Sequence, residues 1–137
     1  MTVVLDSWAA LRHLEDDGAA AAEVADLLDN DRPLMSWINL GEVHYVLRRR
    51  NGEEAAVSTV SDLRDVVDAR LPDERLVLDA ARVKADHPMA YAHAFAAALA
   101  IAHDAVVWTG DPELLVAGMP WRWKDLRPPQ ESRPATT

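Results

Sequence analysis

Val3-Val4-Leu5-Asp6-Ser7, near the amino terminus, is the stretch that decides the fold class. Residues 2–5 form a short run with two valines and no alternation of apolar and polar side chains, which predicts a strand buried on both faces. Helical spacing follows through Trp8, Leu11 and Leu14. The order strand, turn, helix places Asp6 at the carboxyl end of a buried strand.

The rest of the chain continues this alternation. Strands are predicted at 34–36, 75–78, 105–108 and 121–124, and helices at 19–29, 38–50, 53–69, 79–86 and 91–103. The helix at 91–103 is apolar around most of its circumference, which is typical of an enclosed helix. We expect a single three-layer α/β/α domain at 1–127, with a short, mostly parallel central sheet. Residues 128–137 lack an apolar stripe and are expected to be a disordered tail.

Composition limits the classes of function. The 137 residues carry 14 Lys and Arg against 23 Asp and Glu, a formal net charge of −9, which argues against binding nucleic acid through a general positive field. The densest basic patch, Arg48-Arg49-Arg50, is typical of a helix end, where cations complement the dipole. The absence of cysteine removes disulfides and thiolate-zinc sites. No apolar stretch approaches the roughly 20 residues of a membrane span, so we expect a cytoplasmic protein with no membrane partner.

Three acids follow apolar runs at widely separated positions: Asp6, Glu42 and Asp111. In an open parallel sheet the usable crevice lies beyond the carboxyl ends of the strands, where the pattern places Asp6 and Asp111. Carboxylates from separate elements can hold Mg²⁺ or Mn²⁺, which activates water and stabilises a phosphodiester transition state. Packed together without a cation, they would repel one another. The three acids therefore predict a metal centre.

Each acid also has an ordinary structural explanation. Asp6 can cap the helix that follows it, Glu42 can be an acid favoured in a first helical turn, and Asp111 can form a turn before Pro112. For any one of them alone, the structural explanation is the better interpretation. Their joint placement favours the metal centre.

Four motifs resemble those of PIN domains, and among these the VapC-type toxins of bacterial toxin-antitoxin pairs. The motifs are Val4-Leu5-Asp6-Ser7, Gly41-Glu42-Val43 followed by Tyr45 and Leu47, the alanine-rich stretch 91–100, and Trp108-Thr109-Gly110-Asp111-Pro112. The resemblance covers roughly residues 2–126 in element order. It implies a PIN-like fold and a homodimeric endoribonuclease that uses Mg²⁺ or Mn²⁺, cleaves RNA, and is held inactive by a cognate antitoxin.

The resemblance also implies roles for single residues. Asp6, Glu42 and Asp111 match the first, second and fourth family acids, with Asp6 and Asp111 as metal ligands. Ser7 and Thr109 match hydroxyl positions that support the metal shell. The third family acid falls on His93, so the implied catalytic set is Asp6, Glu42, His93 and Asp111.

His93 departs from the family pattern within the site itself, because imidazole suits Mg²⁺ poorly. Three accounts are open: an inactivating substitution, a degenerate site that leaves a binding protein, or a working ligand or base in a modified centre. We rank the first account highest, since a toxic ribonuclease harms its host, and the third lowest. His44 lies near Glu42 in sequence, and His13, His87 and His103 are expected at the surface.

The leading hypothesis is an RNA-cleaving toxin that His93 impairs. A second is a catalytically inactive PIN-like module that binds an antitoxin or RNA. A third is an aspartyl-phosphate receiver, which also places acids at strand ends. A receiver needs a pair of acids after its first strand, whereas Asp6 is followed by Ser7.

Overall fold

The chain folds as an alternation of strands and helices over the described residues, 1–15 and 18–129, of a computed structural model. The elements are β1 (Val3–Leu5), α1 (Ser7–Glu15), α2 (Ala19–Asn30), β2 (Leu34–Ser36), α3 (Trp37–Asn51), α4 (Glu53–Val66), β3 (Asp68–Arg70), α5 (Glu74–Asp86), α6 (Tyr91–Ala102), β4 (Val106–Thr109) and β5 (Arg122–Asp125). This order confirms the α/β class.

The five strands form one sheet in the order β3-β2-β1-β4-β5, and every neighbouring pair is parallel. Strand β1 is central: Val4 pairs with Leu34 of β2, and Leu5 pairs with Trp108 of β4. In a parallel sheet all strands end at the same edge. The residues that follow β1 and β4 are therefore brought together, although they lie about a hundred positions apart in the sequence.

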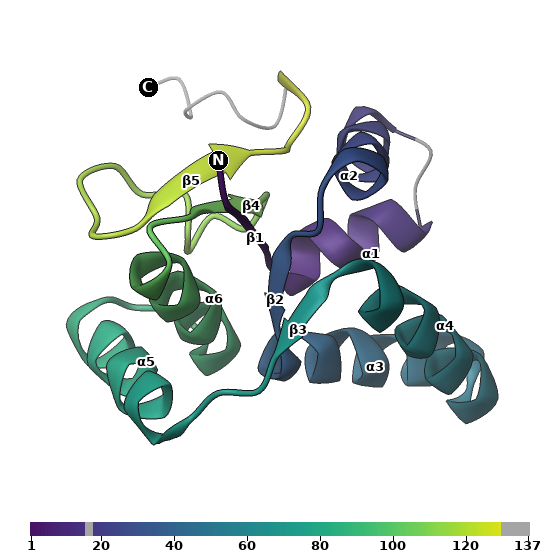
Figure 1. Ribbon diagram of the computed structural model, residues 1–137, viewed down its shortest axis with the longest axis horizontal. Helices are drawn as coiled ribbons and strands as arrows, with labels where there is room; N and C mark the ends of the chain where they lie inside the picture. The colour runs from purple at the N-terminus through teal and green to yellow at the C-terminus, as the bar shows by residue number, and fades with distance from the viewer. Residues whose placement is uncertain (16–17, 130–137) are drawn as a thin grey trace.

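Helices cover both faces of the sheet, as the three-layer prediction requires (Figure 1). Val3 and Leu5 of β1 pack in a core with α1, α2, α3 and α4, whereas Val4 packs in a second core with α5 and α6. Alternate side chains of β1 thus enter opposite layers, and all three are buried. Helix α6 is enclosed as predicted, because every residue from 93 to 100 is buried.

The strand predicted at 75–78 is wrong, because this segment is the first part of helix α5. The carboxylate of Asp73 caps the helix by accepting a hydrogen bond from the backbone N–H of Leu76 at 2.8 Å. Leu76, Ala80 and Val83 recur at helical spacing and pack against the second core. The capping residue and this spacing outweigh the apolar run from Leu76 to Leu78, which resembled a strand.

The helix predicted at 53–69 is wrong at its end. Helix α4 stops at Val66, and Asp68–Arg70 form the edge strand β3 beside β2. Nothing local marks Asp-Ala-Arg as a strand. Three contacts hold the segment extended. It pairs with β2, the neighbouring Val67 is buried, and the Nε of Arg70 lies 2.9 Å from Asp68 Oδ1.

The structure bears only in part on the predicted tail and on the expected absence of a membrane span. Residues 130–137, which make up most of the predicted tail, lie outside the described residues, so the tail and the domain boundary remain predictions. Within the described part, no helix has the length and apolar character needed to cross a bilayer.

Candidate metal centre

Asp6 is fully buried at the point where β1 passes into α1. One carboxylate oxygen, Oδ1, accepts a hydrogen bond from the backbone N–H of Ala9 at 2.9 Å, as a helix-capping residue does. The other oxygen, Oδ2, accepts one from the Thr109 hydroxyl at the end of β4. Asp6 therefore caps helix α1 and also joins strands β1 and β4 at their carboxyl ends.

Burial raises the pKa of Asp6 from 3.8 to about 7. The hydrogen bonds from Thr109 and Ala9 and the charge of His93 oppose this rise, whereas the negative charge of Asp111 adds to it. A buried carboxylate whose charge is poorly compensated favours a cation beside it. The electrostatics of Asp6 are those of a site that lacks a positive charge.

Asp111 is joined to Asp6 through the side chain of Thr109. The Thr109 hydroxyl oxygen accepts a hydrogen bond from the backbone N–H of Asp111 at 2.9 Å while it donates to Asp6. Asp111 Oδ1 in turn accepts from the backbone N–H of Glu113 at 2.9 Å, and its Oδ2 lies 3.2 Å from His93 Nε2. Both oxygens of Asp111 are thus held in fixed directions.

Gly110, between Thr109 and Asp111, packs directly against the indole of Trp8. A Cβ at position 110 would lie 2.2 Å from Trp8 Cζ2, well inside van der Waals contact. The absence of a side chain lets the backbone after β4 approach α1 closely. This approach brings Asp111 up to the same edge as Asp6.

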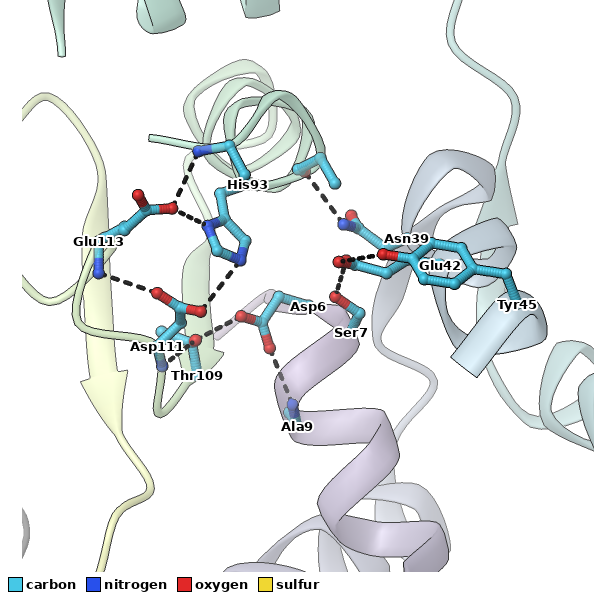
Figure 2. Close-up of polar contacts among 12 residues, drawn as sticks. Asp6, Ser7, Ala9, Asn39, Glu42, Tyr45, His93, Thr109, Asp111 and Glu113 are labelled. Carbon is cyan, nitrogen blue, oxygen red and sulfur yellow. Dashed lines mark hydrogen bonds and ion pairs between the residues drawn. The ribbon is translucent and has the colours of Figure 1, made fainter. Parts of the chain in front are cut away.

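His93 lies in the first turn of α6 with only 7% of its surface exposed. Its Nδ1 lies 2.7 Å from Glu113 Oε1, so both ring nitrogens face a carboxylate (Figure 2). Glu113 Oε1 also accepts a hydrogen bond from the backbone N–H of Ala90 at 2.9 Å. This hydrogen bond from Ala90 lowers the pKa of Glu113, and His93 and Lys84 lower it further. Partial desolvation of the carboxylate opposes the change.

Glu113 was missed in the sequence. Its only signal was a second acid two residues after Asp111, in Thr109-Gly110-Asp111-Pro112-Glu113. Together with His93 and Asp111 it forms a group whose three ligand atoms all lie within 4.8 Å of one another, close enough to hold a metal ion.

Glu42 approaches from α3 and is partly exposed. Its Oε1 accepts a hydrogen bond from the Ser7 hydroxyl, and its Oε2 accepts a weak one from the Tyr45 hydroxyl at 3.4 Å. In Figure 2 the carboxylate points toward the space bordered by Asp6 and His93. Ser7 follows Asp6 directly, so the predicted residues are linked into one cluster.

Asn39 is a second residue that the sequence did not indicate. It is fully buried one turn before Glu42, and its Nδ2 donates to the backbone carbonyl of Ala92 at 3.0 Å. This bond joins α3 to the start of α6, next to His93. Asn39 Oδ1 has no hydrogen-bond partner among the described residues.

The donor set fits a divalent cation. Carboxylate oxygens are the hard ligands that Mg²⁺ and Mn²⁺ prefer, and Asp111 and Glu113 supply them in one group with His93, whereas Asp6 and Glu42 lie outside that group. The imidazole of His93 adds a nitrogen ligand, which suits Mn²⁺ or Zn²⁺ better than Mg²⁺. The site therefore fits the class of cation that the sequence predicted, but with one ligand of a different character.

Arg48, Arg50 and His44, outside the candidate centre, pair with acids of neighbouring helices. Arg48, Arg49 and Arg50 lie in the last turn of α3, as their ordinary explanation required. Arg48 Nε lies 2.6 Å from Glu53 Oε2, and Arg50 pairs with Glu15. His44 Nε2 lies 3.3 Å from Glu53 Oε1, so it pairs with the neighbouring helix. Of the three histidines expected at the surface, His103 is exposed, whereas His13 and His87 are partly buried.

A cavity of about 720 Å³ lies away from these residues, between α5 and the second half of α6. Leu76, Val83 and Leu99 contribute to its walls, and none of the predicted site residues does. This cavity is therefore separate from the candidate metal centre.

Known proteins share this fold and part of this sequence. The PIN domain family matches residues 3–118, whereas no curated protein matches. A chain of the VapBC2 complex from Rickettsia felis, bound to a DNA fragment from its promoter, has a TM-score of 0.74 at 14% identity, covering 91% of this chain and 98% of the other. A chain of VapBC-1 from Haemophilus influenzae has a TM-score of 0.71 at 22% identity, with coverage of 92% and 98%.

A third similar structure is VapC20 from Mycobacterium tuberculosis, a toxin that cleaves the sarcin-ricin loop. It has a TM-score of 0.71 at 24% identity, covering 85% of this chain and 95% of the other. At these identities the structures establish the fold. The family match spans most of the chain, from β1 to the segment after Asp111, and with the parallel sheet and the acids at its edge it shows that the chain belongs to the PIN domain family.

Proposed function

We propose that this protein is a metal-dependent endoribonuclease, the toxin of a VapBC-type toxin-antitoxin pair. The observation that carries the proposal is the linkage of Asp6 and Asp111 through Thr109 at the carboxyl edge of the sheet, with His93 and Glu42 beside them. Membership of the PIN family and the likeness to VapC20, a sarcin-ricin loop cleaving toxin, support RNA as the substrate.

Asp6 and Asp111 are the proposed ligands of Mg²⁺ or Mn²⁺. A bound divalent cation stabilises the charge that develops on the scissile phosphate and lowers the pKa of coordinated water. Thr109 orients both ligands, because its hydroxyl donates to Asp6 and accepts from the backbone of Asp111. Ser7 plays the corresponding part for Glu42.

Glu42 is the proposed acceptor of the proton that the attacking water loses. Among the described residues, its Oε2 accepts one bond, the weak 3.4 Å bond from Tyr45, so this oxygen retains capacity to accept. Oε1 is already held by Ser7, which fixes the direction of the carboxylate. The proton moves from water to Glu42 Oε2 while the water oxygen bonds to phosphorus and the bond from phosphorus to the leaving ribose oxygen breaks. The leaving oxygen takes up a proton from solvent water and departs as a hydroxyl.

The negative charge of the chain makes the cation more important for RNA binding. Arg48 and Arg50 are engaged with Glu53 and Glu15, which reduces their capacity to attract phosphates. Charge at the centre itself is therefore the proposed anchor for the phosphate.

The proposed partners are a cognate antitoxin and a second copy of this chain. Support for the antitoxin comes from the similar structures, which include VapBC complexes from Rickettsia felis and Haemophilus influenzae. A cytoplasmic location, where RNA and antitoxin would both be met, belongs to the same proposal.

Impaired activity is part of the proposal, because His93 replaces an expected acid. The alternative is a catalytically inactive PIN-like module that binds an antitoxin or RNA. One observation favours this alternative: an imidazole stands where the family pattern has an acid, which removes a negative charge that would attract a cation.

The test is cleavage of a structured RNA in the presence of Mn²⁺, by the wild-type protein and by His93→Asp. We expect weak cleavage by the first and stronger cleavage by the second. Asp6→Asn in each background is the control and should remove the signal. If neither protein cuts RNA although both are folded by circular dichroism, the nuclease proposal fails. A stable complex with an antitoxin, without metal binding by calorimetry, would then support the binding module.

A further inference from the structure

The surroundings of His93 differ from those of a histidine that merely fills a core. The ring is nearly buried, and its two nitrogens lie on opposite sides with different carboxylates. Nδ1 lies 2.7 Å from Glu113 Oε1, a short hydrogen bond. Nε2 lies 3.2 Å from Asp111 Oδ2, on the side of the ring that faces the acids of the sheet edge (Figure 2).

This arrangement is the one found around histidines that bind metals. A metal-ligating imidazole usually donates its second ring N–H to a carboxylate, which fixes the tautomer and increases the basicity of the ligating nitrogen. Glu113 occupies the position of that carboxylate, because it faces Nδ1 and leaves Nε2 directed at Asp111.

The separation between Nε2 and the Asp111 oxygen also suits two donors that share one ion. Ligand atoms about 2.0–2.2 Å from a common ion lie about 2.8–3.6 Å apart for octahedral or tetrahedral angles. The observed 3.2 Å falls within this range.

Glu113 is itself held firmly in place. Its Oε1 accepts from the backbone N–H of Ala90, the residue that precedes the first turn of α6. The same oxygen faces His93, so the carboxylate is fixed by the helix that carries the imidazole. The hydrogen bond from Ala90 also helps to keep Glu113 ionised.

We propose that His93 Nε2 is a metal ligand beside Asp111, oriented by Glu113, and that this centre selects a transition-metal cation, Mn²⁺ or Zn²⁺, over Mg²⁺. Nitrogen ligands favour these cations, whereas Mg²⁺ prefers oxygen alone. Glu113 is a positioning residue that acts through His93. The inference rests on the proposed metal centre but not on RNA cleavage. It favours the modified-centre account of His93 over the inactivating one.

The test measures metal binding directly, without RNA. The chelator-treated full-length protein is titrated with Zn²⁺, Mn²⁺ and Mg²⁺ by calorimetry, alongside His93→Asp and Glu113→Gln. We expect the ratio of Zn²⁺ to Mg²⁺ affinity to fall at least about tenfold in His93→Asp, because an oxygen ligand replaces nitrogen. Glu113→Gln should weaken Zn²⁺ binding by about 10–100-fold, since the group that orients the imidazole is lost.

The matched control is His103→Asp. His103 is exposed just beyond the last turn of the same helix, and this variant makes the same change of charge away from the centre. It should bind all three cations as the wild type does.

A spectroscopic measurement covers the case in which His93→Asp does not fold. Mn²⁺ bound to the wild-type protein should show ¹⁴N coupling from an imidazole in pulsed electron paramagnetic resonance, and Glu113→Gln should weaken or abolish that signal. Absence of nitrogen coupling, or an unchanged Zn²⁺ to Mg²⁺ ratio in His93→Asp, overturns the inference. Failure of RNA cleavage with intact nitrogen-ligated Mn²⁺ would instead count only against the nuclease proposal.

Discussion

Asp6 and Glu42 belong to the same candidate centre but are supported in different ways. Asp6 is completely buried, and its carboxylate is bonded to the backbone of Ala9 and to Thr109 on a neighbouring strand. Glu42 is partly exposed on α3, and its carboxylate accepts hydrogen bonds from the side-chain hydroxyls of Ser7 and Tyr45. The sheet fixes the first acid, and the surface of a helix presents the second. Changes near Asp6 should therefore affect folding, whereas changes near Glu42 should affect it little.

The largest effect is expected from the charge of Asp6. Because its pKa rises from 3.8 to about 7 on folding, the metal-free folded protein keeps a proton between these values that the unfolded chain has lost. The free energy of unfolding should therefore fall as the pH rises from about 4 to about 7. At about 1.4 kcal/mol per pKa unit, the loss above pH 7 is on the order of 4 kcal/mol.

Urea unfolding in the presence of a chelator, at pH 5 and pH 8, measures this loss. Asp6→Asn should remove most of the difference and be more stable than the wild type at pH 8. Glu42→Gln is the matched comparison and should keep the dependence that Asp6 causes. An Asp6→Asn protein with the wild-type pH dependence would contradict the assignment.

Gly110→Ala should be the next most disruptive change. The added Cβ would lie 2.2 Å from the Trp8 ring, so the segment that carries Asp111 must move or the indole must shift. We expect a destabilisation of about 1–3 kcal/mol, as for overpacked cores. A double-mutant cycle measures the interaction free energy between the two positions. It compares urea unfolding of Gly110→Ala, Trp8→Leu and the double variant. Additive effects would show that the contact does not limit this position.

Gly41→Ala makes the same chemical change next to Glu42 on helix α3. Nothing lies within 4 Å of a Cβ at position 41, and the residue is inside helix α3. Alanine loses less backbone entropy than glycine on folding, so we expect a gain of about 0.5–1 kcal/mol. A loss of stability in thermal or urea unfolding would mean that the surface around Glu42 is more tightly packed than its exposure indicates.

The smallest effect is expected from Tyr45→Phe. The Tyr45 hydroxyl lies 3.4 Å from Glu42 Oε2, and the side chain is 46% exposed. Its removal should change the free energy of unfolding by less than about 0.5 kcal/mol, which is typical of surface substitutions. A larger change in the same urea assay would show that Glu42 depends on Tyr45 as well as on Ser7.

The sequence indicated the parts of the centre that follow apolar runs. Asp6 and Asp111 could be found because β1 and β4 are short apolar runs, buried throughout in β1 and at alternate residues in β4, and parallel strands bring their ends together. Ser7, Thr109 and His93 came from the family resemblance, and the structure places all of them in the same cluster. The roles of these residues in catalysis and metal binding remain proposals.

Other features depended on contacts that no local pattern carries. Asn39 bonds to the carbonyl of Ala92, 53 positions away, and Glu113 bonds to His93, 20 positions away. The edge strand β3 is specified by its neighbour β2, because Asp68-Ala69-Arg70 has no strand propensity of its own. Helix α5 does have a local signal in the sequence, because Asp73 caps its start. The apolar run after Asp73 nevertheless led to the prediction of a strand.

The central place of β1 determines when the cluster can form during synthesis of the protein. Strand β1 must wait for β4 to leave the ribosome, since the residues that bond at their ends, Asp6 and Thr109, lie 103 positions apart. Nascent fragments that end before β4 contain Asp6 but cannot complete the cluster. A chain that is still being synthesised therefore lacks the completed cluster until β4 has left the ribosome.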